Sequence, residues 1–372
     1  MKRFVLLLSL MLSVILCCQA QRRFNPKDFN YSSREWKMIA RHCPDSFLNS
    51  PLARQFAENV LVWQRNTGGW PKNEAIHRPL GGDRDLILAD KEKRNDSTTD
   101  NDATILEMTY LARMWHVVPD PRYKNAFLKG LRFMLDGQYD NGGWPQFWPE
   151  NRGYQVHITY NDDAMVQTMR VIRDLRDGIK PFDGLVNAET KAELDKAFNK
   201  GIECILKTQI RVNGKPTVWC QQHDRETFAP ASARSYELPS YCSSESASLV
   251  RLLMELPNPD QRIIDAVNGA MEWFEKHKIT GIRLETYRME DGRYDRRVVE
   301  DAKAEPLWAR FYDLKTEEPY FCDRDGIPRK HLSEIGHERR NGYGWYSNGP
   351  AMLVPLYQKW LAEKGITKRQ KR

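Results

Sequence analysis

Residues 64–71 read QRNTGGWP and residues 138–145 read QYDNGGWP, so one octapeptide pattern returns 74 residues later. Each copy follows a segment with apolar residues at helical spacing, over residues 52–65 and 122–138. Weaker third and fourth copies are marked by Gln209, Asn213, Gly214 and Trp219, and then by Trp273 and Gly281. Such self-similarity predicts that one structural unit is used several times along the chain.

The repeat continues after each Gly-Trp-Pro loop with an acidic cluster, Asp-Asn-Asp-Ala at 100–103 and Asn-Asp-Asp-Ala at 161–164. A new helical pattern begins after each cluster. The repeating unit is therefore helix, loop, acidic cap and helix. Because a helical hairpin cannot bury its apolar face alone, we expect the hairpins to stack around a common axis as an α/α toroid, with the connecting loops at one end.

Helical periodicity dominates the chain, as in Ile105, Met108, Leu111, Ala112 and Trp115. Similar patterns cover residues 52–65, 122–138, 163–177, 189–208, 244–256 and 261–277. No alternating segment of comparable length competes with them. We predict a mainly α fold, an α/α toroid or incomplete helical barrel, with short strands confined to loops.

The first 20 residues have the composition of a signal peptide, because Lys2 and Arg3 precede an apolar run from Phe4 to Leu16, and the small residues Cys18 and Ala20 fit cleavage before Gln21. An uncleaved anchor and a lipoprotein are the alternatives. No later segment is apolar for long enough to span a bilayer. We expect a secreted protein, periplasmic or extracellular, with one catalytic domain over residues 21–366 and a basic tail over residues 367–372.

The formal charge is +7, and it falls to +5 when Lys2 and Arg3 are removed. This excess suits a polyanionic partner, whereas export argues against nucleic acid. Neither a membrane nor a second copy of the chain is expected as a partner. Five cysteines remain after cleavage, and their scatter argues against a zinc site. Two disulfides and one buried thiol are expected.

The acidic clusters at 100–102 and 161–163 have two interpretations. Asp and Asn before an apolar run are good helix caps. The two clusters together, however, supply more carboxylate and amide oxygens than capping needs, and hard oxygen ligands suit Ca²⁺. Neither cluster has the spacing of an EF-hand loop, so a calcium site here would be shallow and assembled from separate loops.

The segment 219–246 is polar, contains turn residues and lies between helices, which is typical of an ordered functional loop. The groups in it that can meet a charged substrate are His223, Asp224, Arg225, Arg234 and Glu245. A basic and aromatic stretch follows, with Arg310 and Arg324. Arginine forks grip carboxylates, but these two can instead pair with nearby Asp313, Asp323 or Asp325.

The tryptophans of the repeated loops, Trp70 and Trp144, are expected mainly as packing anchors, while Lys72 and Asn73 can face a ligand. His157 and His223 have no nearby nucleophile motif such as G-x-S-x-G. A triad hydrolase is therefore not expected.

Several strings resemble one known family in the expected order, over roughly residues 50–350. They are GGWPKN, STTDNDATILEM, NGGWPQFWP, HITYNDDAM, WCQQHDRETFAPASARSYELPS and RFYDLKTEEPYFCDRDG. Together they resemble the family-ten polysaccharide lyases, the α/α-toroid pectate lyases. The resemblance implies calcium-assisted anti β-elimination on polygalacturonate, which gives 4,5-unsaturated oligogalacturonides.

Carried over residue by residue, the resemblance implies that Asp100 and Asp162 organise calcium and the substrate carboxylate. Asn101 and Asp163 are their neighbours in the predicted metal site, and either Asp162 or Asp163 can be the direct ligand. The other predicted site residues are Arg234 as catalytic base, with Arg225 as its competitor, and Arg310, Arg324, Lys72, Arg225 and His223 as substrate-binding groups. Asp102 departs from the family pattern, which leaves the number of calcium ions open.

The implied chemistry is physically reasonable, because a cation and an arginine on the uronate carboxylate stabilise the charge formed when the C5 proton leaves. Arginine is a base only when its environment favours the neutral form, which predicts an alkaline optimum. Two other classes remain open from the residues alone. One is an inverting glycoside hydrolase that uses Asp100 and Asp162 as its carboxylate pair, and the other is a non-catalytic glycan-binding protein.

Overall fold

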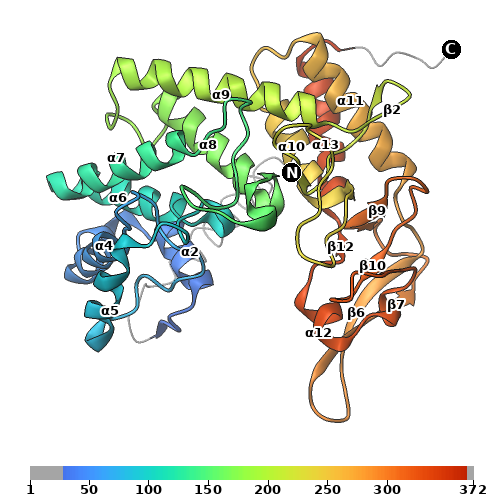
Figure 1. The fold of residues 1–372 in the computed structure, drawn as a ribbon, viewed down its shortest axis with the longest axis horizontal. Coiled ribbons are helices and arrows are strands. Elements are labelled where there is room, and N and C mark those ends of the chain that lie inside the picture. Colours follow the sequence, from blue (N-terminus) through green and yellow to red (C-terminus); the bar gives the residue numbers. More distant parts are fainter. Residues whose placement is uncertain (1–27, 367–372) are drawn as a thin grey trace, which may run out of the picture. The chain divides into compact units, whose positions relative to one another are not determined.

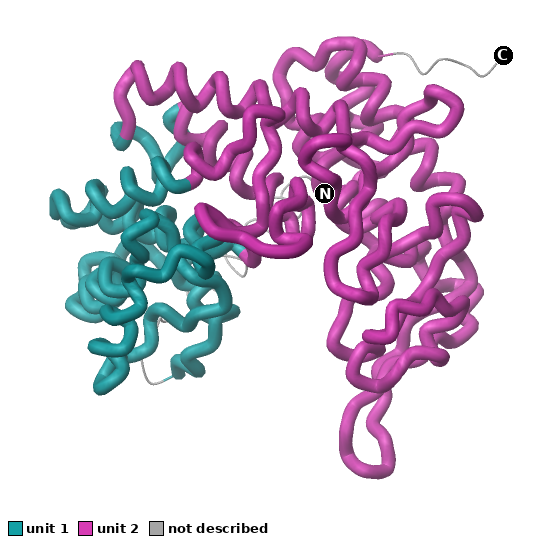
Figure 2. Tube along the Cα trace, in the orientation of Figure 1, with its two compact units in different colours: residues 1–98, 102–133, 178–185 teal, residues 99–101, 134–177, 186–372 magenta. Residues whose placement is uncertain are grey.

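The computed structural model describes residues 28–366 of the chain (Figure 1). The predicted signal peptide and basic tail lie outside the described residues. Every helix within residues 28–366 is too short or too polar to span a bilayer. The described chain divides into two compact units (Figure 2): unit 1 contains the residues up to 98, 102–133 and 178–185, and unit 2 contains 99–101, 134–177 and the residues from 186 onward.

Unit 1 is helical. Its helices are α2 (Ser33–His42), α3 (Asp45–Leu48), α4 (Pro51–Trp63), α5 (Arg84–Ala89), α6 (Ile105–Val117) and most of α7 (Pro121–Asp136). Helix α4 begins where the Ser50 side chain accepts a hydrogen bond from the Ala53 amide, with Pro51 in the first turn. Helices α2 and α4 both pack on α6, whose tyrosine, Tyr110, is fully buried.

Unit 2 carries the remaining long helices. They are α8 (Ala164–Asp177), α9 (Ala188–Thr208), α10 (Ser243–Met254), α11 (Gln261–Lys276), the short α12 (His337–Gly342) and α13 (Gly349–Glu363). Asn187 and Asp260 cap α9 and α11 through their side chains. Helix α8 packs on α9, and α10 packs on both α11 and α13. The predicted helical segments thus match α4 and α6–α11, and the mainly α class is confirmed.

The strands form two-stranded antiparallel ladders in the loops of unit 2. Most have two or three residues: β1 (Ile158–Thr159) with β4 (Gln222–His223), β2 (Arg211–Val212) with β3 (Lys215–Pro216), β5 (Ser240–Cys242) with β9 (Phe311–Asp313), β8 (Trp308–Ala309) with β12 (Tyr346–Ser347), and β10 (Phe321–Cys322) with β11 (Pro328–Arg329). The exception is the hairpin of β6 (Ile282–Arg288) and β7 (Tyr294–Glu300), seven residues a strand, which lies beside α12 (Figure 1).

The repeat seen in the sequence has a hydrogen-bonding basis. The Gln64 amide donates to the carbonyls of Gly68 and Ala126, at 2.8 Å each. Gln138 does the same with Gly142 and Ala197, and Gln209 with Thr217 and Ala266. Each glutamine therefore donates to one carbonyl of its own loop and to one carbonyl of the helix that begins the next copy of the repeat. The weak third copy is a real structural copy.

The repeated tryptophans are packing anchors. Trp70 and Trp144 are fully buried, and their indole N–H groups donate to the carbonyls of Val60 and Met134 at 2.8 Å. Trp219 makes the same kind of bond to Ile205, and Trp308 to Phe274. The fourth copy is thus marked by Trp308, where Trp273 had been expected.

The first glycine of each Gly-Gly-Trp loop is needed for two reasons. Gly68 and Gly142 have φ of 95° and 93°, which a side chain rarely tolerates. A Cβ atom would also lie 2.4 Å from the Lys129 carbonyl oxygen at Gly68, and 2.0 Å from that of Lys200 at Gly142. The loop backbone therefore lies directly against the next helix.

The cysteines correct one expectation. All five described cysteines, Cys43, Cys204, Cys220, Cys242 and Cys322, are free and buried. The expected two disulfides are therefore wrong. Burial of unpaired cysteine is common. These thiols also make polar contacts; for example, Cys242 donates to Glu245 at 2.7 Å, and Cys43 accepts from Arg113 at 3.2 Å.

Candidate active site

The two acidic clusters form short 3-10 turns, η4 (Asp100–Asp102) before α6 and η6 (Asn161–Asp163) before α8. In both turns the second and third residues are left-handed: φ is 55° and 66° at Asn101 and Asp102, and 49° and 61° at Asp162 and Asp163. Asn and Asp tolerate this conformation better than other side chains. The backbone thus makes Asn101 equivalent to Asp162, and Asp100 equivalent to Asn161.

Side-chain capping does not explain the cluster at η4. Thr104 precedes α6, and no side chain makes a cap hydrogen bond there. Asp102 turns instead toward α2, where it pairs with Lys37 and accepts from Arg41 at 2.8 Å. Asp102, the position that departs from the family pattern, is therefore an anchor for α2 within unit 1.

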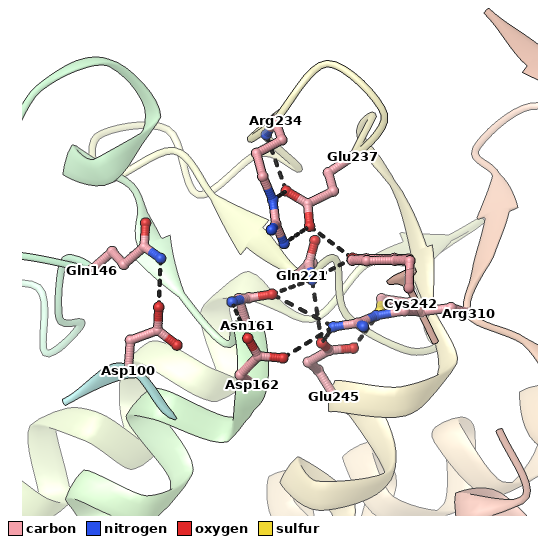
Figure 3. Close-up of polar contacts among 11 residues, drawn as sticks. Asp100, Gln146, Asn161, Asp162, Gln221, Arg234, Glu237, Cys242, Glu245 and Arg310 are labelled. Atoms are coloured by element: carbon pink, nitrogen blue, oxygen red, sulfur yellow. Dashed lines mark hydrogen bonds and ion pairs between the residues drawn. The ribbon is translucent and has the colours of Figure 1, made fainter. Parts of the chain in front are cut away.

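Asp100 is 1% exposed and belongs to unit 2. One of its carboxylate oxygens accepts a hydrogen bond from Gln146 at 2.7 Å. The Asp100 charge raises the pKa of Asp162, although burial, Arg310 and Glu245 each have a larger effect on that pKa. The predicted neighbours Asp100 and Asp162 are therefore in one electrostatic environment (Figure 3).

Arg310 is the centre of the site, in the turn between β8 and β9. Its side chain is only 10% exposed and forms an ion pair with Glu245, which is itself buried. The Asp162 carboxylate lies 3.6 Å from the same guanidinium and is 40% exposed. Asn161 accepts from Gln221 and lies 3.5 Å from Arg310 (Figure 3). A buried cation thus faces a carboxylate that is open to solvent.

The charges at this centre perturb one another. Burial by itself lowers the pKa of Arg310, but Glu245, Tyr343 and other groups outweigh it and hold that pKa well above its usual value. Burial raises the pKa of Asp162, although Arg310 opposes it. Burial and the Glu245 charge raise the pKa of Asp163 to about 6. The carboxylates are crowded, so an added cation would be favoured beside them.

Arg234 lies on the loop between β4 and β5, with its side chain 42% exposed. Its guanidinium is gripped by the buried Glu237, with Arg234 Nε donating at 2.7 Å and Nη2 donating to the second oxygen. Burial lowers the pKa of Arg234, but the hydrogen bonds and charge of Glu237 raise it above its usual value. Arg234 is therefore a charged, paired arginine in this state.

Other predicted residues lie elsewhere. His223 is fully buried: its Nε2 accepts from the Cys220 amide at 3.0 Å, its Nδ1 lies 2.9 Å from the Phe228 carbonyl, and burial lowers its pKa to about 4. It is a neutral support for its own loop. Arg225 is exposed over the Tyr139 ring. Lys72 belongs to unit 1.

Arg324 is 65% exposed on the loop after β10, and its guanidinium pairs with Glu338 at 3.0 Å. Neither it nor Arg310 pairs with the aspartates considered from the sequence, because Asp325 is held by Arg329 and Asp313 caps its own turn. Arg310 is therefore held by a glutamate 65 positions away, and Arg324 by one 14 positions away.

Sequence reasoning missed several members of the cluster: Gln146, Gln221, Glu237, Cys242 and Tyr343. Gln221 and Glu237 lie in the polar loop that the sequence singled out, but nothing marked them as partners of arginine. Tyr343 lies 106 positions beyond its partner Glu237, in a segment that gave no signal. Only the fold brings these side chains to Arg310 and Arg234.

The site suits a cation in its donor chemistry. Within residues 28–366, no group of three or more His, Cys, Asp or Glu side chains is gathered to hold a metal ion. The oxygens of Asp162, Asp163 and Asn161 are hard donors on one turn, and burial, together with the Glu245 charge, raises the pKa of both carboxyls. These residues fit a Ca²⁺ ion that takes its remaining ligands from substrate and water.

Comparison with known proteins places the chain in a family. The family model for pectic acid lyase matches residues 64–354. A family 10 polysaccharide lyase from Cellvibrio cellulosa is 31% identical, with a TM-score of 0.74, and the match covers 88% of this chain and 95% of that one. A mutant of a family 10 lyase from Cellvibrio cellulosa, in complex with trigalacturonic acid, matches with the same score over 96% of its length. A search of curated proteins found no match. The chain therefore belongs to the pectic acid lyase family and is a family 10 polysaccharide lyase.

Proposed function

We propose that this lyase cleaves α-1,4-linked polygalacturonate by calcium-assisted anti β-elimination and releases 4,5-unsaturated oligogalacturonides. The relative crystallised with trigalacturonic acid supports this substrate class. The observation that carries the proposal is the buried Arg310 beside the exposed carboxylate of Asp162. An arginine fixed in this way recognises a carboxylate at a defined place.

Arg310 is the proposed ligand of the uronate whose proton is removed. Its guanidinium is already oriented by Glu245, so little side-chain entropy is lost when substrate binds. The charge that develops on the uronate carboxylate meets a cation that needs no rearrangement. This preorganisation is the main contribution that the chain itself offers to the reaction.

A calcium ion is the proposed cofactor, held by Asp162 and Asp163 with Asn101, Asp100 and Asn161 nearby. When bound, calcium supplies a Lewis acid that withdraws charge from the uronate carboxylate. Asp162 is placed for this role because it is exposed and its neighbour Asn161 donates to one oxygen at 2.9 Å, which fixes the carboxylate plane. Asp163 is partly buried beside Glu245.

Arg234 is the proposed base. In the reaction the C5–H bond breaks, its electrons form the C4–C5 double bond, and the C4–O bond breaks with the leaving oxygen taking a proton from water. Because Glu237 holds the pKa of Arg234 above its usual value, the neutral form is rare at neutral pH. The rate should therefore rise as pH increases through the alkaline range.

Arg324 is a proposed second carboxylate ligand, and Arg225 and Lys72 are proposed to contact more distant parts of the chain of sugars. At Arg324, a substrate carboxylate would replace Glu338, which is exposed and holds the same fork. His223 is not carried forward, since both of its ring nitrogens face the backbone.

The family assignment also supports proposals about the whole molecule. We propose that residues 21–366 form one catalytic domain with the α/α-toroid architecture and that the protein is a monomer. Residues 1–20 are proposed to direct secretion, which gives a periplasmic or extracellular enzyme with no membrane or nucleic-acid partner.

The test is incubation with polygalacturonate, with calcium or with chelator, followed by ultraviolet absorbance of the unsaturated product. Wild-type protein should give product only with calcium. Arg234→Lys should lower turnover by about 10²-fold or more, since positioned acid-base groups contribute that much. The matched control is Arg211→Lys, an exposed arginine on β2, which should retain activity.

Asp162→Ala separates calcium binding from catalysis. Calcium alone should raise the melting temperature of the wild-type protein and leave that of Asp162→Ala nearly unchanged. A saturated product, or full activity in chelator, would refute β-elimination assisted by calcium. Equal activity of Arg234→Lys and wild type would remove Arg234 from the base role.

A further inference from the structure

Tyr343 lies between the two arginines to which the proposed reaction assigns different tasks. Its ring centroid is 4.6 Å from Cζ of Arg310 and 5.6 Å from Cζ of Arg234. Both distances are within the range of cation–π attraction. One aromatic ring thus contacts both the proposed substrate ligand and the proposed base.

The Tyr343 hydroxyl continues this connection through hydrogen bonds. It donates to Glu237 Oε1 at 2.7 Å, and it accepts from Gln221 Nε2 at 3.2 Å. Gln221 Nε2 also lies 3.3 Å from Glu245 Oε1. The buried side chains therefore form one path, Arg234–Glu237–Tyr343–Gln221–Glu245–Arg310, most of which is visible in Figure 3.

The ring itself is held firmly. Phe311 stacks on it with centroids 6.1 Å apart, and Tyr236 and Trp345 pack against it at 5.3 Å and 5.0 Å. Arg296, from β7, donates to the Tyr343 carbonyl at 3.3 Å. These contacts therefore fix the position of the Tyr343 hydroxyl.

An ordinary core tyrosine also has a satisfied hydroxyl. Here, however, the acceptor is the carboxylate that orients Arg234. Glu237 has a side chain 3% exposed, whereas Arg234 is 42% exposed, so the orientation of the more exposed member of the pair depends on the buried one. Arg310, in contrast, has its own direct ion pair with Glu245 and does not depend on the hydroxyl.

We propose that Tyr343 is a positioning residue for Arg234, acting through Glu237. This inference rests on the proposed function. Tyr343→Phe keeps the ring between the two guanidiniums and removes only the hydroxyl. Glu237 then loses a donor and holds Arg234 less firmly. The expected result is a fall in kcat of about ten-fold, the effect of losing one hydrogen bond to a charged group, with KM changed by less than about two-fold.

The experiment measures kcat and KM on polygalacturonate with calcium for wild type, Tyr343→Phe, Glu237→Gln and the double variant. If the hydroxyl acts through Glu237, the double variant should lose little more than Glu237→Gln alone. Tyr110→Phe is the matched control: its hydroxyl donates to Ala53 at 2.9 Å in unit 1, so it should lose stability while kcat stays unchanged. Melting temperatures are recorded for all variants.

The inference would be overturned by an unchanged kcat in Tyr343→Phe, or by effects of Tyr343→Phe and Glu237→Gln that multiply independently. A rise in KM at constant kcat would also overturn it, since the hydroxyl would then serve Arg310. These outcomes differ from failure of the proposed function, in which wild-type protein itself gives no unsaturated product.

Discussion

Glu107→Gln should remove a pH dependence of stability that the wild-type chain carries. Glu107 lies on α6, is 2% exposed, and accepts a hydrogen bond from the Trp36 indole of α2 at 2.7 Å. Its second oxygen is buried with no hydrogen-bond partner within the described chain. Burial raises the pKa of this carboxyl from 4.5 to about 7, although the Trp36 hydrogen bond opposes the rise.

The sign follows from the raised pKa. A carboxyl whose pKa is higher in the folded state stabilises the fold fully below pH 4.5, and that contribution is lost as pH rises through 7. The change corresponds to about 3 kcal/mol between acid and alkaline pH. Glutamine stays neutral and still accepts from Trp36. Glu107→Gln should therefore be more stable than wild type by about 3 kcal/mol above pH 8 and nearly equal to it near pH 4.

The assay is urea denaturation followed by tryptophan fluorescence at the two pH values, with the free energy of unfolding extrapolated to water. Trp36→Phe is the matched variant, because it removes the donor that lowers the pKa of Glu107 and so should extend the loss of stability to higher pH and make the total loss larger. The reasoning is refuted if Glu107→Gln and wild type differ by the same free energy at both pH values.

Two further predictions concern the arginine ligand and the repeated loop. Glu338→Gln should lower KM for polygalacturonate about two- to three-fold at constant kcat, because a neutral amide competes less well than a carboxylate for the Arg324 guanidinium. The kinetic control is Glu334→Gln, since the Glu334 carboxylate caps its own turn. An unchanged KM in Glu338→Gln would show that Arg324 does not contact substrate. Gly142→Ala should lower the free energy of unfolding by roughly 3 kcal/mol or more, because its Cβ would meet the Lys200 carbonyl oxygen. Gly153 has φ of 55° and open space around it, so Gly153→Ala should lower that free energy by only about 1 kcal/mol. Equal losses of the two variants in urea titrations would contradict this account.

Local pattern predicted α4 and α6–α11 because these helices carry apolar residues at helical spacing, and some have recognisable starts, such as Ser50 before α4 and Asp260 before α11. Helices α2, α3, α5, α12 and α13 were missed. The third copy of the repeat was visible only as Gln209 and Trp219, yet both make the same bonds as in the first two copies. The long hairpin of β6 and β7 was missed. Its Asp291-Gly292 turn was a usable signal, but its strands are largely exposed and lack clean alternation.

The site was predictable only in part. The acidic turns and Arg310 were found because residue type and neighbouring motif pointed to them. The sequence did not predict which residues of the two turns correspond, because the left-handed backbone at Asn101 and Asp162 cannot be seen in the composition. Nor did the sequence separate Asp102, which is tied to Lys37 and Arg41, from its neighbours. Pairings such as Arg310 with Glu245 join residues 65 positions apart, and only packing decides them.

The buried thiols have a practical consequence for handling the enzyme. Burial raises the pKa of Cys43 and Cys322 to about 11, and that of Cys204 to about 12, so almost no reactive thiolate forms at neutral pH. Reducing agents have no cross-link to break among the described residues, and alkylating reagents find no accessible sulfur there. The described fold can therefore be produced in a reducing host compartment without an oxidative refolding step.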